Sequence, residues 1–424
     1  MSVAAGVYES LGNDNFRDDY FFLSIELGIS VPTSGEYATD VLYCCPYHTD
    51  TSRQLRIACR GGCPVAGRPR MPMRQQRRFR VTTQLAVSAP EFGEFDFHTV
   101  VGAFRPRVAA MQPTSTYHGM GMQVQYVYAY LGDEQGNSYV VERKFIGSMT
   151  GGLYVMCNEY GSLHLRPETA LSARGEIRRF SSPEMRRWSE PVMQRTREGI
   201  APRDERPLTV ELTDSSVLWD EGDLLHLEGT PGALGVQGYA PMPEDPWFYS
   251  EYPCRVSGTV VGRRCRGIMV VETGYWKHGV EPKEAKFYQE LEHSFNAFGN
   301  LLDDGTMQWG TLVRGSRGMC VAAVVEDRDG IGTVVLASGE LDCRYRIEES
   351  GQIHYAEQES AGQVWEYRSD ETGHMDDFEA SRWDGYGSMA GITTLRGDSR
   401  RVEFGYGWFE YFRDRIPADK RIRG

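Results

Sequence analysis

The stretch of sequence that decides the fold is WFYSEYPCRVSGTVVGRRCRGIMVVETGYW, residues 247–276. It holds two runs rich in Val, Tyr, Trp and other strand-favouring residues, and a Gly-Arg-Arg turn at 262–264 joins them. Gly258, Gly262 and Gly267 fall where a barrel strand has to bend, turn or let another backbone approach closely. The stretch therefore predicts a long antiparallel hairpin within a β-barrel.

Strand signals also dominate the rest of the chain. Segments rich in Val, Tyr and Phe recur at short intervals, and turn residues such as those of GDEQGN (132–137) bound them. The clearest are VQYVYAYL (124–131), SYVVERKF (138–145), GTVVLASGEL (332–341) and RRVEFGYGWFEYF (400–412). Short strands separated by turns indicate antiparallel sandwiches or barrels rather than α/β units, so the predicted fold class is all-β.

The organisation of the chain follows from its length and one helical pattern. A length of 424 residues favours two domains. The segment 181–199 predicts a helix, with Ser182 as its cap and Pro183 in its first turn. We therefore predict two β-barrel or sandwich domains, residues 1–195 and 196–424, joined by a short helical linker.

Two similar hairpins support the idea of related halves. Each combines hydrophobic strands with an acidic turn, and they lie at 121–145 and 293–315. The similarity is loose and does not amount to a demonstrated repeat, but two related barrels explain it best.

Composition argues against several classes of protein. A net charge of -13, from 59 acidic and 46 basic residues, argues against nucleic-acid binding. No apolar run approaches the roughly 18 residues of a membrane-spanning helix. The N-terminus lacks the basic and apolar regions of a secretory signal, which predicts a cytoplasmic protein. Five of the basic residues are lysine, and this bias towards arginine is typical of a GC-rich bacterial genome. The sequence leaves open whether the protein forms a homo-oligomer.

One group of cysteines has a spacing that resembles zinc ligands. Its members are Cys44, Cys45, His48, Cys59 and Cys63. The gap between the last two cysteines departs from the usual tight knuckle, so thiols in a strand-and-loop region are the favoured interpretation. The sequence has no P-loop, GxGxxG, GxSxG or HExxH motif, so we predict no metal and no cofactor.

The pattern of the long hairpin resembles a known family. It begins with Tyr-Ser at 249–250, and an apolar residue two positions before a glycine follows. After a turn come a further glycine and then an acidic residue three positions before an aromatic one. This resembles the carotenoid 1,2-hydratase and hydroxyneurosporene synthase family, and the wider group of tandem lipocalin-like proteins that includes fungal hydratases and decalin-forming Diels–Alderases. That group commonly has Trp, Asp and Trp where this chain has Val270, Glu272 and Tyr275. The resemblance, clearest over residues 220–310, implies two lipocalin-like barrels.

Glu272 is the strongest candidate for a catalytic residue. It lies in the apolar run IMVVETGYW (268–276), where burial raises the pKa of a carboxyl group and makes a proton donor available near neutral pH. The competing interpretation is a surface-facing residue paired with Arg264 or Arg266. Both interpretations are left open at this point.

Other side chains would complete a site around Glu272. The aromatic candidates for stabilising a carbocation-like transition state are Tyr249, Tyr275, Trp276 and Trp309. Either His278 or His293 would position or deprotonate water. Tyr117 and His118 could line the mouth of the first barrel, although a loop histidine without a role is favoured.

These residues lead to three hypotheses about function. The first is a cofactor-independent hydratase or dehydratase that acts on a small hydrophobic, isoprenoid-like substrate. The second is a cyclase or pericyclase in which the shape of the pocket does most of the work, so that Glu272→Gln costs little. The third is a carrier of a lipid or terpenoid that catalyses nothing.

Overall fold

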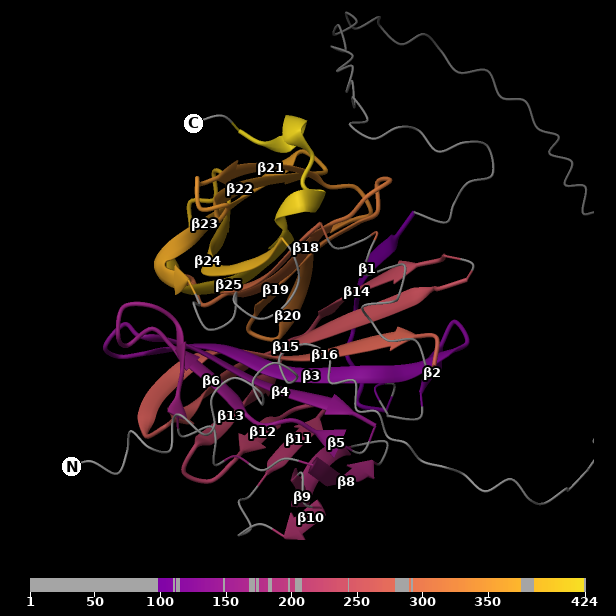
Figure 1. Ribbon diagram of the computed structural model, residues 1–424, viewed down its shortest axis with the longest axis vertical. Helices are drawn as coiled ribbons and strands as arrows, with labels where there is room; N and C mark the ends of the chain where they lie inside the picture. The colour runs from indigo at the N-terminus through magenta and orange to yellow at the C-terminus, as the bar shows by residue number, and fades with distance from the viewer. Residues whose placement is uncertain are drawn as a thin grey trace, which may run out of the picture. The chain divides into compact units, whose positions relative to one another are not determined.

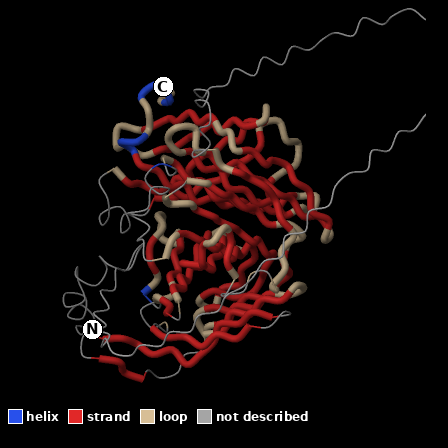
Figure 2. The backbone as a smooth tube through the Cα atoms, turned by 90° about the vertical axis from the view of Figure 1, so that its right-hand side faces the viewer, coloured by secondary structure: helices blue, strands red, loops and turns tan. Residues whose placement is uncertain are grey.

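The computed structural model describes residues 98–109, 111, 115–147, 149–167, 172, 175–181, 185–196, 199–202, 208–242, 244–278, 290, 293–374 and 385–422, and the statements below concern these residues. They all belong to one compact unit of the chain. Figure 1 shows two β-sheets, and in Figure 2 strands make up most of the backbone. The predicted all-β fold class is confirmed. Within the described ranges, no helix is long and apolar enough to cross a membrane.

The first sheet contains the strands up to residue 276. They are β1 (Val100–Phe104), β2 (Thr116–Tyr117), β3 (Met120–Asp133), β4 (Ser138–Ile146), β5 (Met149–Thr150), β6 (Tyr154–Cys157), β7 (His164–Leu165), β8 (Gly175–Ser181), β9 (Met185–Thr196), β10 (Gly199–Pro202), β11 (Thr209–Thr213), β12 (Val217–Asp220), β13 (Leu225–Pro231), β14 (Gly235–Ala240), β15 (Trp247–Val260) and β16 (Arg263–Trp276). Their order is β2-β3-β16-β15-β13-β12-β11-β9-β8-β5-β4-β6-β7. Because β4 also pairs with β3, most of these strands form a closed ring.

The second sheet contains the remaining strands. They are β17 (Ser294–Leu302), β18 (Met307–Arg314), β19 (Cys320–Arg328), β20 (Ile331–Ser338), β21 (Asp342–Ile347), β22 (Ile353–Ser360), β23 (Gln363–His374), β24 (Tyr386–Leu395) and β25 (Val402–Phe412). Their order is β20-β19-β18-β17-β25-β24-β23-β22-β21, and all neighbours are antiparallel. Two short 3-10 helices follow, η3 (Arg413–Arg415) and η4 (Ala418–Lys420).

Buried apolar side chains gather in three large clusters. Alternation along the strands directs Val127 of β3 and Met269 of β16 into the core of the first sheet. The next residues, Tyr128 and Val270, point the opposite way and pack with Trp309 of the second sheet. The second sheet has its own core, which includes Phe298, Trp365 and Phe409. The two sheets therefore meet through an apolar interface that both supply.

The predicted long hairpin is the β15–β16 pair. It turns at Val261 and Gly262, whose φ angles are 46° and 75°, slightly earlier than the predicted turn at 262–264. A Cβ atom on Gly258 would lie 1.8 Å from the backbone oxygen of His226, and one on Gly267 would lie 2.0 Å from that of Tyr130. The glycines permit the close approach of neighbouring strands that the sequence predicted.

The other predicted strands are also present. The segments 124–131, 138–145, 332–341 and 400–412 correspond to β3, β4, β20 and β25. The two hairpins with acidic turns are β3–β4 and β17–β18. They belong to different sheets, so each sheet does contain one of the two similar hairpins.

The helical linker predicted over 181–199 is wrong. This segment forms the end of β8 and the whole of β9. β9 pairs with β8 on one edge and with β11 on the other, and these ladders override the helical pattern. Pro191 has no partner in either ladder, which is how a strand can accommodate a residue without an N–H donor.

The change from one sheet to the other comes between Trp276 and Ser294. The predicted division after residue 195 instead falls inside β9, which pairs with β8 before it and with β11 after it. The domain bounds 1–195 and 196–424 concern folding units and stay a prediction.

Candidate active site

Two glutamates lie next to each other on the face of the first sheet that packs against the second. Glu251 of β15 is in register with Glu272 of β16, and Glu272 is in register with Tyr126 of β3. Residues in register point to the same face of a sheet. Tyr249 and Val270, each two positions away, belong to the apolar cluster shared with the second sheet. Both carboxyl groups therefore face the interface between the sheets.

Glu251 is fully buried and is held by three donors. The Tyr249 hydroxyl donates to Oε1 at 2.5 Å, and Nε1 of Trp309 donates to Oε2 at 2.7 Å. The Thr311 hydroxyl also donates to Oε2. Burial raises the pKa of Glu251, and these hydrogen bonds to the carboxylate oppose the rise. Since both oxygens have donors, Glu251 is the member of the pair that can carry the charge.

Glu272 has weaker support. It is half-buried, and the Tyr249 hydroxyl lies within reach of its carboxyl group and opposes the rise in its pKa. The Tyr249 hydroxyl has a single hydrogen, which it gives to Glu251. Burial, and then the charge of Glu251, raise the pKa of Glu272 well above its usual range. Glu272 is therefore the member that holds the proton, and part of it can be reached from outside.

The ion pair considered for Glu272 does not form. Arg264 and Arg266 are exposed near the hairpin turn, and Arg266 lies 3.7 Å from Glu403 instead. Arg266 lies six positions before Glu272 on β16, which corresponds to roughly 20 Å along the strand.

Tyr128 adds an unsatisfied hydroxyl to the site. The side chain is 7% exposed, and its hydroxyl makes no hydrogen bond of good geometry although it lies within reach of Glu251 and Glu272. Burial, and then the charges of these two carboxyls, raise its pKa. Its ring centroid lies 6.1 Å from that of Trp309, which is fully buried. A buried hydroxyl without a partner is costly, so this atom is available to a bound oxygen.

A second group of carboxyls lies near the first. Glu410 of β25 accepts hydrogen bonds from the Tyr386 hydroxyl at 2.8 Å and from Nε1 of Trp408 at 3.0 Å, both on Oε1. Glu142 of β4 is in register with Tyr128. Burial raises the pKa of Glu142 to about 7, with Lys144 opposing and Glu410 adding to the rise. The interface between the sheets thus contains four carboxyl groups.

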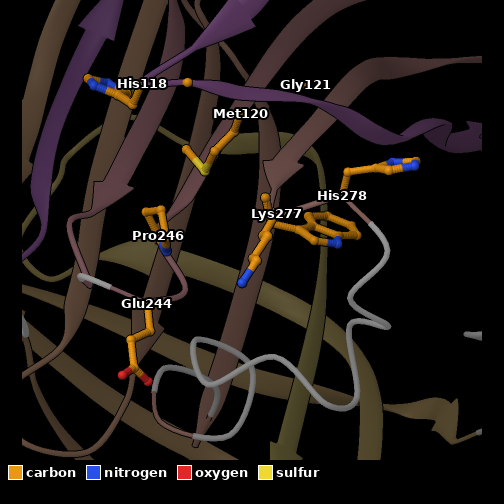
Figure 3. A pocket seen from close by; sticks show the side chains of 9 residues that line it. His118, Met120, Gly121, Glu244, Pro246, Lys277 and His278 are labelled. Atoms are coloured by element: carbon orange, nitrogen blue, oxygen red, sulfur yellow. The ribbon is translucent and has the colours of Figure 1, made fainter. Parts of the chain in front are cut away.

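Three of the predicted residues line a separate hollow of about 630 Å³. His118, Trp276 and His278 contribute to it, together with Met120, Glu244 and Lys277. In Figure 3 the rings of His118 and His278 lie at opposite ends and point away from each other. The ring of His118 stacks on Tyr239 with centroids 3.9 Å apart. Trp276 also belongs to the apolar interface, so it links the hollow to the face that carries Glu272.

Tyr117 and Tyr275 pack away from the glutamates. The Tyr117 ring lies 5.0 Å from those of both Phe248 and Tyr275, in a small aromatic cluster of its own. A register shift between Gly274 and Tyr275 changes the pairing with β3 just before this residue. The structure does not bring Tyr275 to Glu272.

His293 is not placed to act as the complementary base. It precedes β17, and burial together with Arg415 and Arg314 lowers its pKa to about 4. No contact in the described residues joins His293 or His278 to Glu272. The base function predicted for these histidines therefore finds no support in the geometry.

Sequence reasoning missed several residues of the interface, and for one of them a signal existed. Glu251 and Glu272 each lie ten positions from the Val261–Gly262 turn on their own strands, and such residues pair in a two-residue hairpin. Glu410 has no comparable signal, because it comes from β25 of the second sheet and only packing brings it near β3 and β4. The missed residues are Glu251, Tyr128, Thr311, Glu142 and Glu410.

One group of residues has a spacing that resembles zinc ligands. The group Cys44, Cys45, His48, Cys59 and Cys63 lies outside the described residues. Within the part of the chain that the structure does describe, no three His, Cys, Asp or Glu residues are placed to hold a metal ion.

Solved structures that match the chain have low sequence identity. A protein assigned as AttH from Nitrosomonas europaea is 14% identical, with a TM-score of 0.39, covering 70% of this chain and 93% of its own. CghA is 10% identical, with a TM-score of 0.39 and coverages of 73% and 97%. Kievitone hydratase from Nectria haematococca is 10% identical, with a TM-score of 0.35 and coverages of 78% and 94%. No protein-family model and no curated protein matches the chain.

Proposed function

We propose that the protein is a lyase that adds water to, or removes water from, a hydrophobic isoprenoid-like molecule at the interface between the sheets. The observation that supports this is the Glu251–Glu272 pair. One carboxyl is anchored through both oxygens, and its neighbour is partly accessible and has a pKa that burial and the adjacent charge raise. Two carboxyls whose surroundings separate their pKa values in this way are suited to acid–base chemistry.

The chemistry follows from the side chains around the pair. Glu272 gives its proton to an alkene carbon or to a departing hydroxyl group, and the substrate becomes a carbocation. The charge on Glu251 and the ring faces of Tyr128 and Trp309 stabilise that cation. The free hydroxyl of Tyr128 holds the oxygen that is added or lost. These steps require no cofactor.

The test begins with organic extraction of the purified protein and mass analysis of any bound molecule. Protein with its ligand is then incubated in water labelled with oxygen-18. We expect label to enter a hydroxyl group of the ligand, and Glu272→Gln to slow this entry about a hundredfold or more because the proton donor is lost.

The control is Glu134→Gln, which changes an exposed carboxyl in the β3–β4 turn and should leave the exchange unchanged. A ligand that binds but never exchanges would contradict the lyase and favour the cyclase or the carrier. Exchange that persists in Glu272→Gln would remove Glu272 from the mechanism.

A further inference from the structure

The carboxyl groups at the interface form two pairs: Glu251 and Glu272 are in register on β15 and β16, whereas Glu142 of β4 and Glu410 of β25 come from different sheets and the charge of Glu410 raises the pKa of Glu142. In each pair one member is anchored by a tyrosine hydroxyl and a tryptophan N–H: Glu251 by Tyr249 and Trp309, and Glu410 by Tyr386 and Trp408. Of the other members, Glu272 lies within reach of the Tyr249 hydroxyl that donates to Glu251, and among the described residues no tyrosine or tryptophan donates to Glu142. Each pair therefore combines a carboxylate prepared for charge with a carboxyl that favours its proton.

The two anchored carboxylates differ in one respect that matters for chemistry. Glu251 receives donors on both oxygens, with Thr311 as the third. Glu410 receives both of its donors on Oε1, and within the described chain Oε2 accepts none. A carboxylate with a free oxygen can accept a proton, whereas one with both oxygens occupied is better suited to hold a charge.

Unpartnered hydroxyls show that this interface is prepared for a ligand. Tyr128 and Tyr406 are 7% and 4% exposed, and neither hydroxyl makes a hydrogen bond of good geometry. Tyr128 lies between the pairs, because it is in register with Glu142 and faces Glu251 and Glu272. The Tyr406 ring lies 4.8 Å from that of Tyr130, which also faces Glu410. Buried hydroxyl groups ordinarily have a hydrogen-bond partner, so a bound molecule or water is needed to supply one here.

We propose that Glu410 is the base of the site and that the substrate's reacting carbon becomes cationic between the Glu251–Glu272 and Glu142–Glu410 pairs. The proposal rests on the lyase function. Glu142 acts through Glu410 as a positioning residue. The other charged or titratable groups that face this pair are Lys144, Glu272, Tyr128, Tyr130 and Tyr386.

The proton balance of hydration is complete with these groups. The π electrons of the alkene form a C–H bond to the proton of Glu272, which becomes a carboxylate, and the neighbouring carbon becomes cationic. A lone pair of water forms the new C–O bond, and the proton of that water passes to Oε2 of Glu410. Proton exchange with solvent then returns both groups to their starting states.

A lipophilic ammonium ion tests this assignment without knowledge of the substrate. The probe is N,N-dimethyldodecylamine, which is protonated at pH 7 and places a positive charge at the end of an apolar chain. Dodecan-1-ol has the same chain without the charge. Binding of both to the full chain, below micelle concentrations, is followed by calorimetry and tryptophan fluorescence.

We expect the wild-type protein to bind the amine at least tenfold more tightly than the alcohol. Glu410→Gln should remove most of that preference and leave the affinity for the alcohol unchanged. The exposed Glu134→Gln should retain the preference. The unchanged affinity of Glu410→Gln for the alcohol guards against a folding defect. Equal binding of amine and alcohol by the wild type, or an intact preference in Glu410→Gln, would overturn the proposal.

A carbon-13 titration of labelled glutamate carboxyls separates this proposal from the lyase function. Loss of Glu410 should shift the titration of Glu142 to lower pH, because the neighbouring negative charge is removed. An unshifted Glu142 would contradict the second pair and leave the Glu272 experiment untouched. Conversely, oxygen-18 exchange that survives Glu272→Gln would contradict the lyase while the amine preference still reports on Glu410.

Discussion

Glu221 and Glu251 are both buried in the first sheet, but only Glu221 has a cation beside it. Inside the ring, Nε of Arg143 donates to Glu221 at 2.7 Å, and a second guanidinium nitrogen contacts its other oxygen. Trp219 also donates to Glu221 at 2.9 Å. On the opposite face, Glu251 has only neutral donors and lies next to another carboxyl, Glu272.

The difference shows how to separate a structural carboxylate from a functional one. Arg143 is 0% exposed and neutralises Glu221, so that pair is complete without any ligand. At the interface between the sheets no arginine serves Glu251 or Glu272 within the described residues, and Tyr128 keeps an unsatisfied hydroxyl. The protein thus retains an unfavourable arrangement at this face, which is typical of a functional site.

The largest effect on stability is expected from breaking the Arg143–Glu221 ion pair. Arg143→Met should lower the free energy of unfolding by about 3–5 kcal/mol, because it leaves Glu221 buried and charged. Urea denaturation measures the change. The double variant Arg143→Met/Glu221→Gln should recover part of this loss. A loss of free energy of unfolding below about 1 kcal/mol in Arg143→Met alone would contradict the difference drawn between Glu221 and Glu251.

Removing a carboxyl group from the interface between the sheets should instead make the protein more stable. Folding raises the pKa of Glu142 from 4.5 to about 7, so its contribution to stability is full below pH 4.5 and is lost as the pH rises to about 7. Glu142→Gln should therefore be more stable than the wild type at pH 8, by at most about 3 kcal/mol, and similar to it near pH 4.5. Thermal unfolding across this range measures the difference. Glu134→Gln is the matched control, and a difference that does not depend on pH would disprove the assignment.

The smallest effect concerns one donor to Glu251. Thr311→Val keeps the shape of the side chain but removes a hydrogen bond, so the pKa of Glu251 should rise further and stability should fall by about 1–2 kcal/mol. Carbon-13 titration and thermal unfolding report the two changes. The exposed Thr333→Val is the control, and an unchanged Glu251 titration would show that Thr311 does not support its charge.

The candidate site was predictable in part. Glu272 and Tyr249 are recognisable because an acid and an aromatic interrupt apolar strand patterns, and the interface contains both. Trp309 was predicted as an aromatic neighbour of the substrate, and the structure also makes it a donor to Glu251. His278 and His293 were chosen for their chemistry alone, and neither reaches Glu272 because strand pairing places them elsewhere.

The sequence by itself determined the strands, the long hairpin and the identity of its acid. Alternation, turn residues and glycine are local properties, so they predict strands and a hairpin. The structure places the turn at Val261–Gly262, and that position fixes Glu251 opposite Glu272. Only the tertiary structure decided that 185–196 is a strand and that Glu410 lies near Glu142. Both results depend on which strands pair and which faces pack. Those choices are made by contacts between residues distant along the chain, and no local pattern records them.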